Sequence, residues 1–167
     1  MSKIKIKSNF YCLVMPKLSI NKFAVFFFTL IIVSFAQLGI KAEFGWSPEL
    51  ILATLVLSAF YLGILEMAAL CAFGIFLLNW RPLPGLEIVL FFLFPFVIMY
   101  VKTIFPWKSM INCVFGAVLS VAFFYGVSNW GAIVSNPIIF AYILALTAVF
   151  CAAIFQIFNY FYKTSST

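Results

Sequence analysis

The sequence predicts an all-α integral membrane protein with six transmembrane helices and with both termini in the cytoplasm. Three observations predict it: the composition, the apolar runs and the placement of the charges. Hydrophobic residues make up 66% of the 167-residue chain and charged residues 8%, whereas a soluble domain averages about 45–50% and about 25%. The chain therefore has too few polar residues to cover a water-soluble core, and its hydrophobicity excludes disorder.

Four apolar runs have the composition of membrane-crossing helices, which need about 20 largely apolar residues. They cover residues 23–40, 86–101, 110–127 and 138–162. Lysines bound the first run on both sides, and Pro137 opens the last. The runs are continuously apolar, which excludes a transmembrane barrel, because barrel strands alternate between apolar and polar residues.

The segment 48–80 is too long for one crossing and slightly short for two, with Gly63 and Glu66 near its middle. Two helices turning there would place eight lysines on the side of the termini and only Lys41 and Arg81 on the other. One long helix would instead give five spans and a split of six against four. Because cytoplasmic loops are enriched in basic residues, we predict two helices in this segment and six spans in total.

This topology predicts three parts of the chain: a basic cytoplasmic N-terminal segment over 1–22, a single six-helix transmembrane domain over 23–162, and a short cytoplasmic tail over 163–167. The positions of the tryptophans support this topology. All of them fall at predicted helix ends or loops, and indole rings favour the headgroup zone of the membrane. The net charge of +6 is explained by the lysines at these helix ends, so we expect no nucleic-acid ligand.

The residue types exclude most catalytic and metal chemistry. The chain has no His and no Asp, and its four cysteines include no Cys-x-x-Cys pair. Ser-His-Asp hydrolysis, zinc binding and Asp-held magnesium therefore lack the residues they require. The chain also has no phosphate-binding glycine loop and no paired acids at catalytic spacing. We expect no enzyme, no cofactor and no metal.

Four polar residues are candidates for a functional role: Glu66, Asn79, Arg81 and Glu87. Glu66 lies in the predicted turn, either as a solvated residue or as a partly buried acid facing the bundle. Asn79 can form an interhelical hydrogen bond. Glu87 follows Pro84-Gly85 at the start of a predicted helix, where the helix dipole favours a carboxylate, and Arg81 could pair with it.

Small residues at helical spacing predict close packing between helices. They are Gly116 and Ser120 in the fifth predicted helix and Ala145, Ala148 and Ala152 in the sixth. The partner of each could be a helix of this chain or of another protein.

Three short motifs resemble the rod shape-determining protein MreD family. They are the stretch Pro48 to Leu52, which opens with Pro48-Glu49-Leu50, the stretch Ala72 to Asn79 with Phe73-Gly74 inside it, and Pro84-Gly85-Leu86. The resemblance covers roughly residues 23–130 and extends to length and number of spans. Asn79 stands where that family has an aspartate, so a charge-dependent role at this position does not carry over.

The resemblance implies a non-catalytic scaffold of the bacterial cell-elongation machinery, which directs rod shape and peptidoglycan synthesis. The chain would lie in the plasma (inner) membrane, in contact with lipid. Its implied partners are MreC-like, RodA-like and penicillin-binding-protein-like membrane proteins, and it would act by helix-to-helix association.

The six-helix shape also resembles the substrate-binding S component of energy-coupling-factor vitamin transporters. That alternative implies a small-molecule ligand bound at the outer ends of the helices. The candidate residues would then be Glu43, Trp46, Trp80, Arg81, Glu87 and Trp130. The first predicted helix lacks the Ala-x-x-x-Ala surface of many S components, because Phe28 follows Ala24 by four positions.

Overall fold

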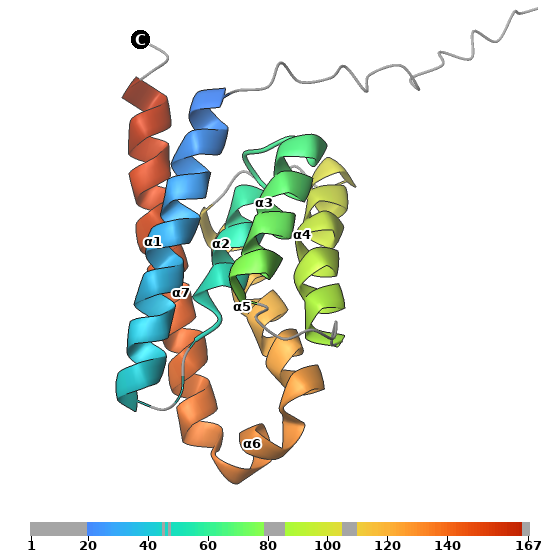
Figure 1. Ribbon diagram of the computed structural model, residues 1–167, viewed down its shortest axis with the longest axis vertical. Helices are drawn as coiled ribbons and strands as arrows, with labels where there is room; N and C mark the ends of the chain where they lie inside the picture. The colour runs from blue at the N-terminus through green and yellow to red at the C-terminus, as the bar shows by residue number, and fades with distance from the viewer. Residues whose placement is uncertain (1–19, 45, 47, 79–85, 105–109, 165–167) are drawn as a thin grey trace, which may run out of the picture.

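The structure, a computed structural model, describes residues 20–44, 46, 48–78, 86–104 and 110–164, and the regular structure in these residues is helical. The helices are α1 (Ile20–Phe44), α2 (Leu50–Ser58), α3 (Ile64–Leu78), α4 (Leu86–Ile104), α5 (Met110–Ser128), α6 (Trp130–Ser135) and α7 (Pro137–Thr164). The start of α1 and the end of α7 lie at the same end of the bundle (Figure 1). Within residues 48–78 the structure has two helices, α2 and α3, rather than one.

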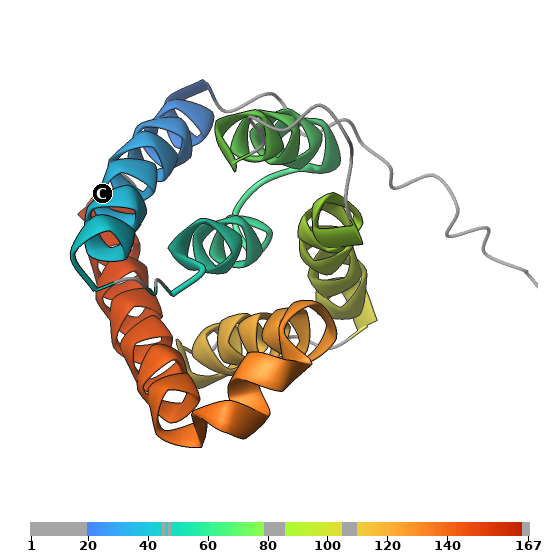
Figure 2. The same cartoon turned by 60° about the horizontal axis from the view of Figure 1, so that its bottom comes forward.

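Helix α2 is the centre of the fold. All of its residues, Leu50–Ser58, are buried, and it contacts α1, α3, α4, α5 and α7. Figure 2 shows these five helices in a ring around it. Its sequence is apolar except for Thr54 and Ser58, whose hydroxyls donate to carbonyls of the same helix, as expected of a helix that is enclosed by protein.

Helix α2 is also much shorter than the membrane-crossing helix that the sequence predicted. Its 9 residues extend about 14 Å at the usual helical rise, less than half of the roughly 30 Å of a bilayer core. Non-helical residues flank it on both sides, among them the buried Pro48 and Leu62. Such backbone is tolerated at membrane depth where protein surrounds it.

The backbone that leaves α2 keeps its hydrogen bonds through the turn before α3. Phe60 N–H donates to the Leu57 carbonyl at 3.2 Å, and the N–H groups of Tyr61 and Leu62 both donate to the Ser58 carbonyl at 3.0 Å. Buried backbone groups without partners are costly. This turn therefore lets the chain reverse before α3 while its amides keep their hydrogen-bond partners.

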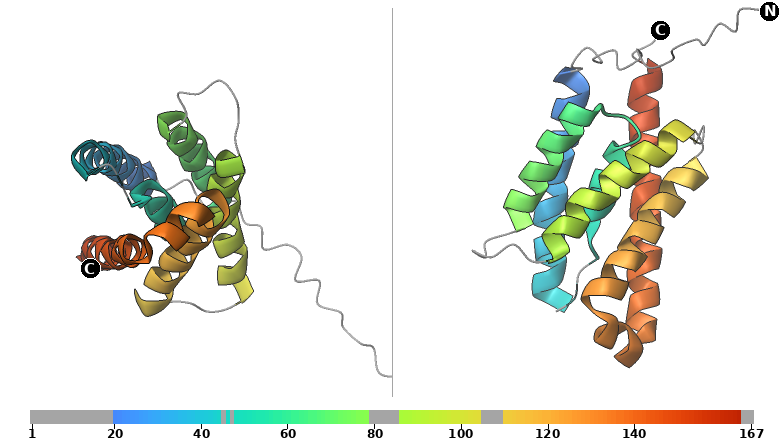
Figure 3. Two further views of the ribbon diagram at one scale, coloured as in Figure 1. Left: turned by 90° about the horizontal axis from the view of Figure 1, so that it is seen from below. Right: turned by 90° about the vertical axis from the view of Figure 1, so that its right-hand side faces the viewer.

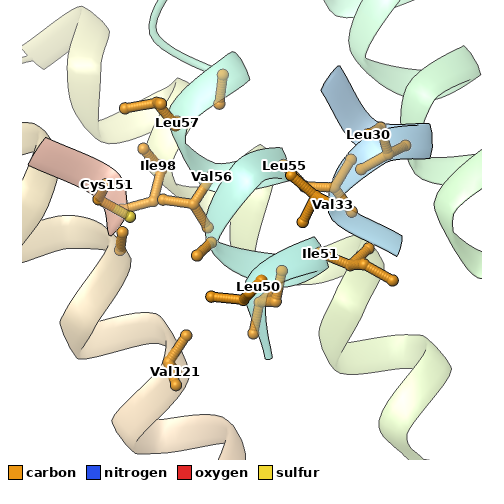
Figure 4. Close-up of a cluster of buried hydrophobic side chains, with 14 of the residues drawn as sticks. Leu30, Val33, Leu50, Ile51, Leu55, Val56, Leu57, Ile98, Val121 and Cys151 are labelled. Carbon is orange, nitrogen blue, oxygen red and sulfur yellow. The ribbon is translucent and has the colours of Figure 1, made fainter. Parts of the chain in front are cut away.

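Aliphatic side chains of α2 fill the space between the surrounding helices. Figure 4 shows Ile51 and Leu55 directed toward α1, where Leu30 and Val33 face them. On the opposite side of α2, Val56 lies beside Ile98 of α4 and Cys151 of α7 (Figure 4). Burial of these side chains supplies the main favourable term for holding α2 in place.

Aromatic pairs join the helices of the ring. Phe26 of α1 and Phe158 of α7 have ring centroids 4.3 Å apart. Phe27 of α1 lies 4.4 Å from Phe73 of α3, measured between ring centroids. Such pairs contribute about 0.5–1.5 kcal/mol beyond the area they bury, so they help to fix the order of helices around α2.

Three of the described helices are long and apolar enough to cross a membrane. They cover Lys22–Phe44, Met110–Ser128 and Pro137–Tyr160, while the apolar segments Ile64–Leu77 and Ile88–Val101 are shorter. Large hydrophobic side chains point outward from the bundle on these long helices, such as Phe35 and Val149, which are 71% and 68% exposed. The helical structure and these three long apolar helices confirm the prediction of an all-α membrane protein.

Helix α6 was not predicted from the sequence. It is a single short helix that joins α5 to α7 at the end of the bundle opposite the start of α1 (Figure 3). Asn129 and Asn136 flank it, and Pro137 is the first residue of α7. Pro is favoured at that position because its missing N–H would have no partner inside the helix.

Candidate functional site

A cleft of about 380 Å³ lies at the end of the bundle that holds α6. Its walls come from the end of α1, the segment that leads into α2, the end of α5, α6 itself and the start of α7. The site thus combines segments that are far apart in sequence. The volume falls in the range of pockets that hold small molecules, about 300–1,000 Å³.

A carboxylate at the start of α2 lines the cleft and is held by the amide of Gln37. Gln37 Nε2 donates to Glu49 Oε2 at 3.0 Å. The same side chain caps α2, because Ile51 N–H donates to Gln37 Oε1 at 3.1 Å. Glu49 is the N-cap residue of α2, and its own side chain makes no capping bond. Gln37 therefore orients Glu49 and satisfies an amide at the start of α2.

Aromatic rings form a second part of the cleft wall. Trp46, Tyr125 and Phe140 line it. The Tyr125 and Phe140 ring centroids lie 6.2 Å apart at an interplanar angle of 69°. The Trp46 ring meets Tyr142 edge-on, with centroids 5.7 Å apart and planes at 90°. These edge-to-face contacts are the geometry that aromatic pairs prefer, and they hold α7 against α5 and the segment before α2.

The rest of the cleft is an apolar wall and a polar rim. Isoleucines of α6 and α7 form the wall: Ile133, Ile139 and Ile143. Lys41, Asn129 and Asn136 form the rim, and all three are exposed. Ile143 is buried, whereas Ile139 is exposed like the polar residues, so both polar and apolar side chains border the opening.

This arrangement is suited to binding. A carboxylate, two amides and three aromatic rings can orient a small ligand, as a few polar groups do in typical apolar pockets. Among the described residues, no group of three or more His, Cys, Asp and Glu side chains could hold a metal ion.

Glu66 lies in the first turn of α3 and is 7% exposed. The expectation of a solvated turn residue is therefore wrong, and the alternative of a buried acid facing the bundle describes it. Gly63 N–H donates to Glu66 Oε2 at 3.0 Å, while the Gly63 carbonyl accepts from Met67 N–H at 2.9 Å. This is the reciprocal half of a capping box, in which an acid in the first turn satisfies the amide that precedes the helix.

The other polar candidates are not among the described residues that line the cleft. Asn79, Trp80 and Arg81 lie outside the described residues. Glu87 is the second residue of α4, and its side chain is likewise outside the described part of the chain. Glu43 and Trp130 are exposed and do not line the cleft, whereas Trp46, another residue of the ligand-binding alternative, does.

The small residues predicted to pack lie in two different environments. Gly116 and Ser120 are buried in α5, and a Cβ at Gly116 would lie 3.5 Å from Ile98 Cδ1 of α4. Their partner is therefore a helix of this chain. On α7, Ala148 and Ala152 are half-buried and Ala145 is exposed, so the outer part of that row lies on the surface of the bundle.

Sequence reasoning did not select Gln37, Glu49 and Tyr125 as a site. Gln37 was one of several polar residues within predicted spans, and Glu49 was part of the Pro48-Glu49-Leu50 motif. A signal that could have paired them is that both lie near the predicted outer ends of neighbouring spans. Tyr125 carried no such signal, because an aromatic residue near a helix end is expected in any membrane protein.

No family model matches the sequence, no curated protein matches it, and no solved structure matches the fold. The functional inference therefore depends on the cleft and on the packing around α2.

Proposed function

We propose that the chain is a non-catalytic membrane scaffold of the bacterial cell-elongation machinery, as the resemblance to the MreD family implies. The observation that carries this proposal is a contact between two of the motifs behind that resemblance. A Cβ at Gly74 would lie 3.2 Å from Leu55 Cδ1 and 3.7 Å from Ile51 Cγ2. The helix that follows Pro48-Glu49 therefore packs on Gly74, and this contact joins Ile51 of the first motif to Gly74 of the second.

The proposed scaffold crosses the plasma membrane six times, with both ends in the cytoplasm. Two observations support this placement. The start of α1 and the end of α7 lie at the same end of the bundle (Figure 1), and the expected topology puts eight lysines on that side. An excess of Lys and Arg marks cytoplasmic loops. The cleft then lies on the outer side of the membrane.

Partner proteins would dock on the outward faces of the long helices. Phe35 of α1, Phe115 of α5 and Val149 of α7 are all more than half exposed, so these faces meet either lipid or other transmembrane helices. Ala145 and Gly39 lie on the same outward surfaces, and small residues allow close approach of a second helix. The proposed partners are MreC-like, RodA-like and penicillin-binding-protein-like proteins.

Purification of the tagged full chain from its native membrane in mild detergent tests the scaffold. We expect wall-synthesis membrane proteins among the co-purifying proteins, and loss of rod shape when the chain is depleted. A second tagged membrane protein of similar size is the control for non-specific co-purification. Enrichment no greater than this control, together with unchanged cell shape on depletion, would contradict the proposal.

A second candidate function is that of a substrate-binding S component, and the cleft favours it. The cleft has the volume of a small-molecule site and carries Trp46, one of the residues that this alternative named. This function predicts transporter ATPase subunits and a small molecule in the same purification. Their presence in place of wall-synthesis proteins would favour the carrier over the scaffold.

A further inference from the structure

The cleft joins two features that attract positive charge. Among the described residues that line it, Glu49 is the acid, and three aromatic rings share the same space. The faces of Trp, Tyr and Phe rings attract cations, by about 0.5–1 kcal/mol at exposed sites and about 2 kcal/mol or more when water is excluded. A carboxylate and an aromatic wall together favour a cationic group over a neutral or anionic one.

The size and lining of the cleft favour an organic cation over a metal ion. Metal sites in proteins use several ligand side chains, and hard cations take six or more oxygens. The cleft offers one carboxylate and an aliphatic wall that includes Ile133 and Ile143. A hydrocarbon group can cover that wall, whereas a hydrated ion cannot.

We infer that the cleft binds a small alkylammonium ligand, with its charged nitrogen beside Glu49 and the aromatic rings and its hydrocarbon part against the isoleucines. Gln37 donates to Glu49 Oε2 at 3.0 Å and so holds the carboxylate in place before the ligand arrives. A carboxylate can accept several hydrogen bonds, so the bond from Gln37 does not by itself exclude a cationic group beside Glu49.

Lys41 stands on the exposed rim and is the group that could oppose this assignment. Its charge is in contact with solvent, which weakens its effect on a ligand inside the cleft. The opposite arrangement, in which Lys41 binds an anion, would make Glu49 a repulsive neighbour. Replacement of each charge in turn therefore separates the two assignments.

Two pairs of probes test the inference on the purified full chain in detergent. Each pair holds a cation and a neutral compound of the same shape: choline with 3,3-dimethylbutan-1-ol, and butylammonium with butan-1-ol. We expect at least one cation to raise the melting temperature in a saturable manner and its neutral partner to have no such effect. Equal effects within each pair, or no effect of either cation, would overturn the inference.

Three variants locate the binding site. Glu49→Gln removes the charge but can still accept from Gln37, and we expect it to weaken cation binding by about tenfold or more. Trp46→Ala should weaken it by about three- to thirtyfold. Glu43→Gln removes a carboxylate outside the cleft and should bind as the wild type does. Binding that requires Lys41 and is unchanged in Glu49→Gln would identify an anion site and overturn the inference.

Fluorescence of Trp46 gives a readout that does not require the Glu49 variant to fold. With Trp80, Trp107 and Trp130 replaced by Phe, Trp46 is the remaining indole. The cation should change its emission saturably, and the neutral partner should not. A cation site is a property beyond the scaffold role. If the chain is instead an S component, the inference names the chemical class of its ligand. The melting-temperature and fluorescence measurements use only the purified chain. Their outcome therefore does not depend on which proteins co-purify with it, so the cation site and the proposed function can fail separately.

Discussion

Gln37 and Glu49 are joined by a 3.0 Å hydrogen bond that ties α1 to the start of the central helix. The other end of the Gln37 amide accepts from Ile51 N–H at 3.1 Å. One side chain thus serves both the cleft and the core, because it orients the cleft carboxylate and caps the helix around which the other helices pack. Polar residues within predicted spans are commonly interhelical hydrogen-bonding groups, and Gln37 is one with two defined partners.

Replacement of Gln37 by Leu should destabilise the bundle. The substitution leaves the buried Ile51 N–H without its acceptor, and an unsatisfied buried donor costs about 1–3 kcal/mol. Unfolding in detergent, followed by tryptophan fluorescence, should therefore show a lower melting temperature. Gln156→Leu on the exposed side of α7 is the matched control and should change stability by no more than about 0.5 kcal/mol. If Gln37→Leu and Gln156→Leu lowered the melting temperature equally, the hydrogen bond from Ile51 N–H to Gln37 would contribute little to stability.

Glu66 should act through its hydrogen-bonding capacity rather than through its charge. Its Oε2 accepts from Gly63 N–H at 3.0 Å, and both Glu and Gln can fill this position of a capping box. We expect Glu66→Ala to lose about 0.5–2 kcal/mol of stability, and Glu66→Gln to lose clearly less. The two melting temperatures decide between these roles. A Gln variant as unstable as the Ala variant would show that the negative charge itself is required.

Gly74 should tolerate only a small side chain. A Cβ there would lie 3.2 Å from the flexible end of Leu55 and 3.7 Å from Ile51, so Ala requires a shift of a few tenths of an ångström and Leu requires the helices to separate. Overpacking of this kind costs about 1–3 kcal/mol. We expect Gly74→Leu to lower the melting temperature and to reduce the yield of folded protein from membranes.

Gly39 is the matched control for Gly74, because a Cβ there would meet nothing within 4 Å. Gly39→Leu adds the same side chain to a helix without a packing partner inside the bundle. It should leave stability unchanged or raise it, because Gly is less favourable than Leu in a helix. If Gly39→Leu were as unstable as Gly74→Leu, the close approach of α3 and α2 could not explain the instability of the Gly74 variant.

Much of the helix order could be predicted because lysines, prolines and loop residues bound the apolar runs. The predicted spans 110–127 and 138–162 correspond closely to α5 and α7. The short length of α2 could not be predicted in the same way. Residues 59–62, which end it, are Ala-Phe-Tyr-Leu, and these apolar residues give no turn signal before Gly63. Their turn depends on tertiary packing, since Ala59 and Leu62 are buried.

The cleft could not be predicted because it depends on which helix ends meet. Glu49 comes from the segment before α2, Tyr125 from α5 and Phe140 from α7, and nothing in their spacing indicates proximity. The chain reversal through α6 brings α5 and α7 together at this end, and α6 itself lacks a long periodic pattern. Glu66 illustrates the same limit, since its sequence position beside a turn left both a solvated and a buried environment open.

The proposed topology predicts opposite labelling of the two ends of the bundle. Helix α3 begins at the end where α1 begins, whereas α6 lies at the other end (Figures 1 and 3). Ile64 and Trp130 are 48% and 64% exposed, so a cysteine at either position can react. In a background with the four native cysteines replaced by alanine, an impermeant maleimide should label Trp130→Cys from outside the cell. Ile64→Cys should react only from the cytoplasmic side.

A cysteine at Val149 completes this experiment. Val149 is 68% exposed and lies near the middle of α7, so lipid should cover it if α7 crosses the membrane. The water-soluble maleimide should then fail to label Val149→Cys from either side, although the same position should react once the protein is unfolded in detergent. Labelling of Ile64→Cys from outside would invert the orientation and place the lysine-rich end on the wrong side for the positive-inside rule. Labelling of Val149→Cys in intact membranes would mean that α7 is not a transmembrane helix.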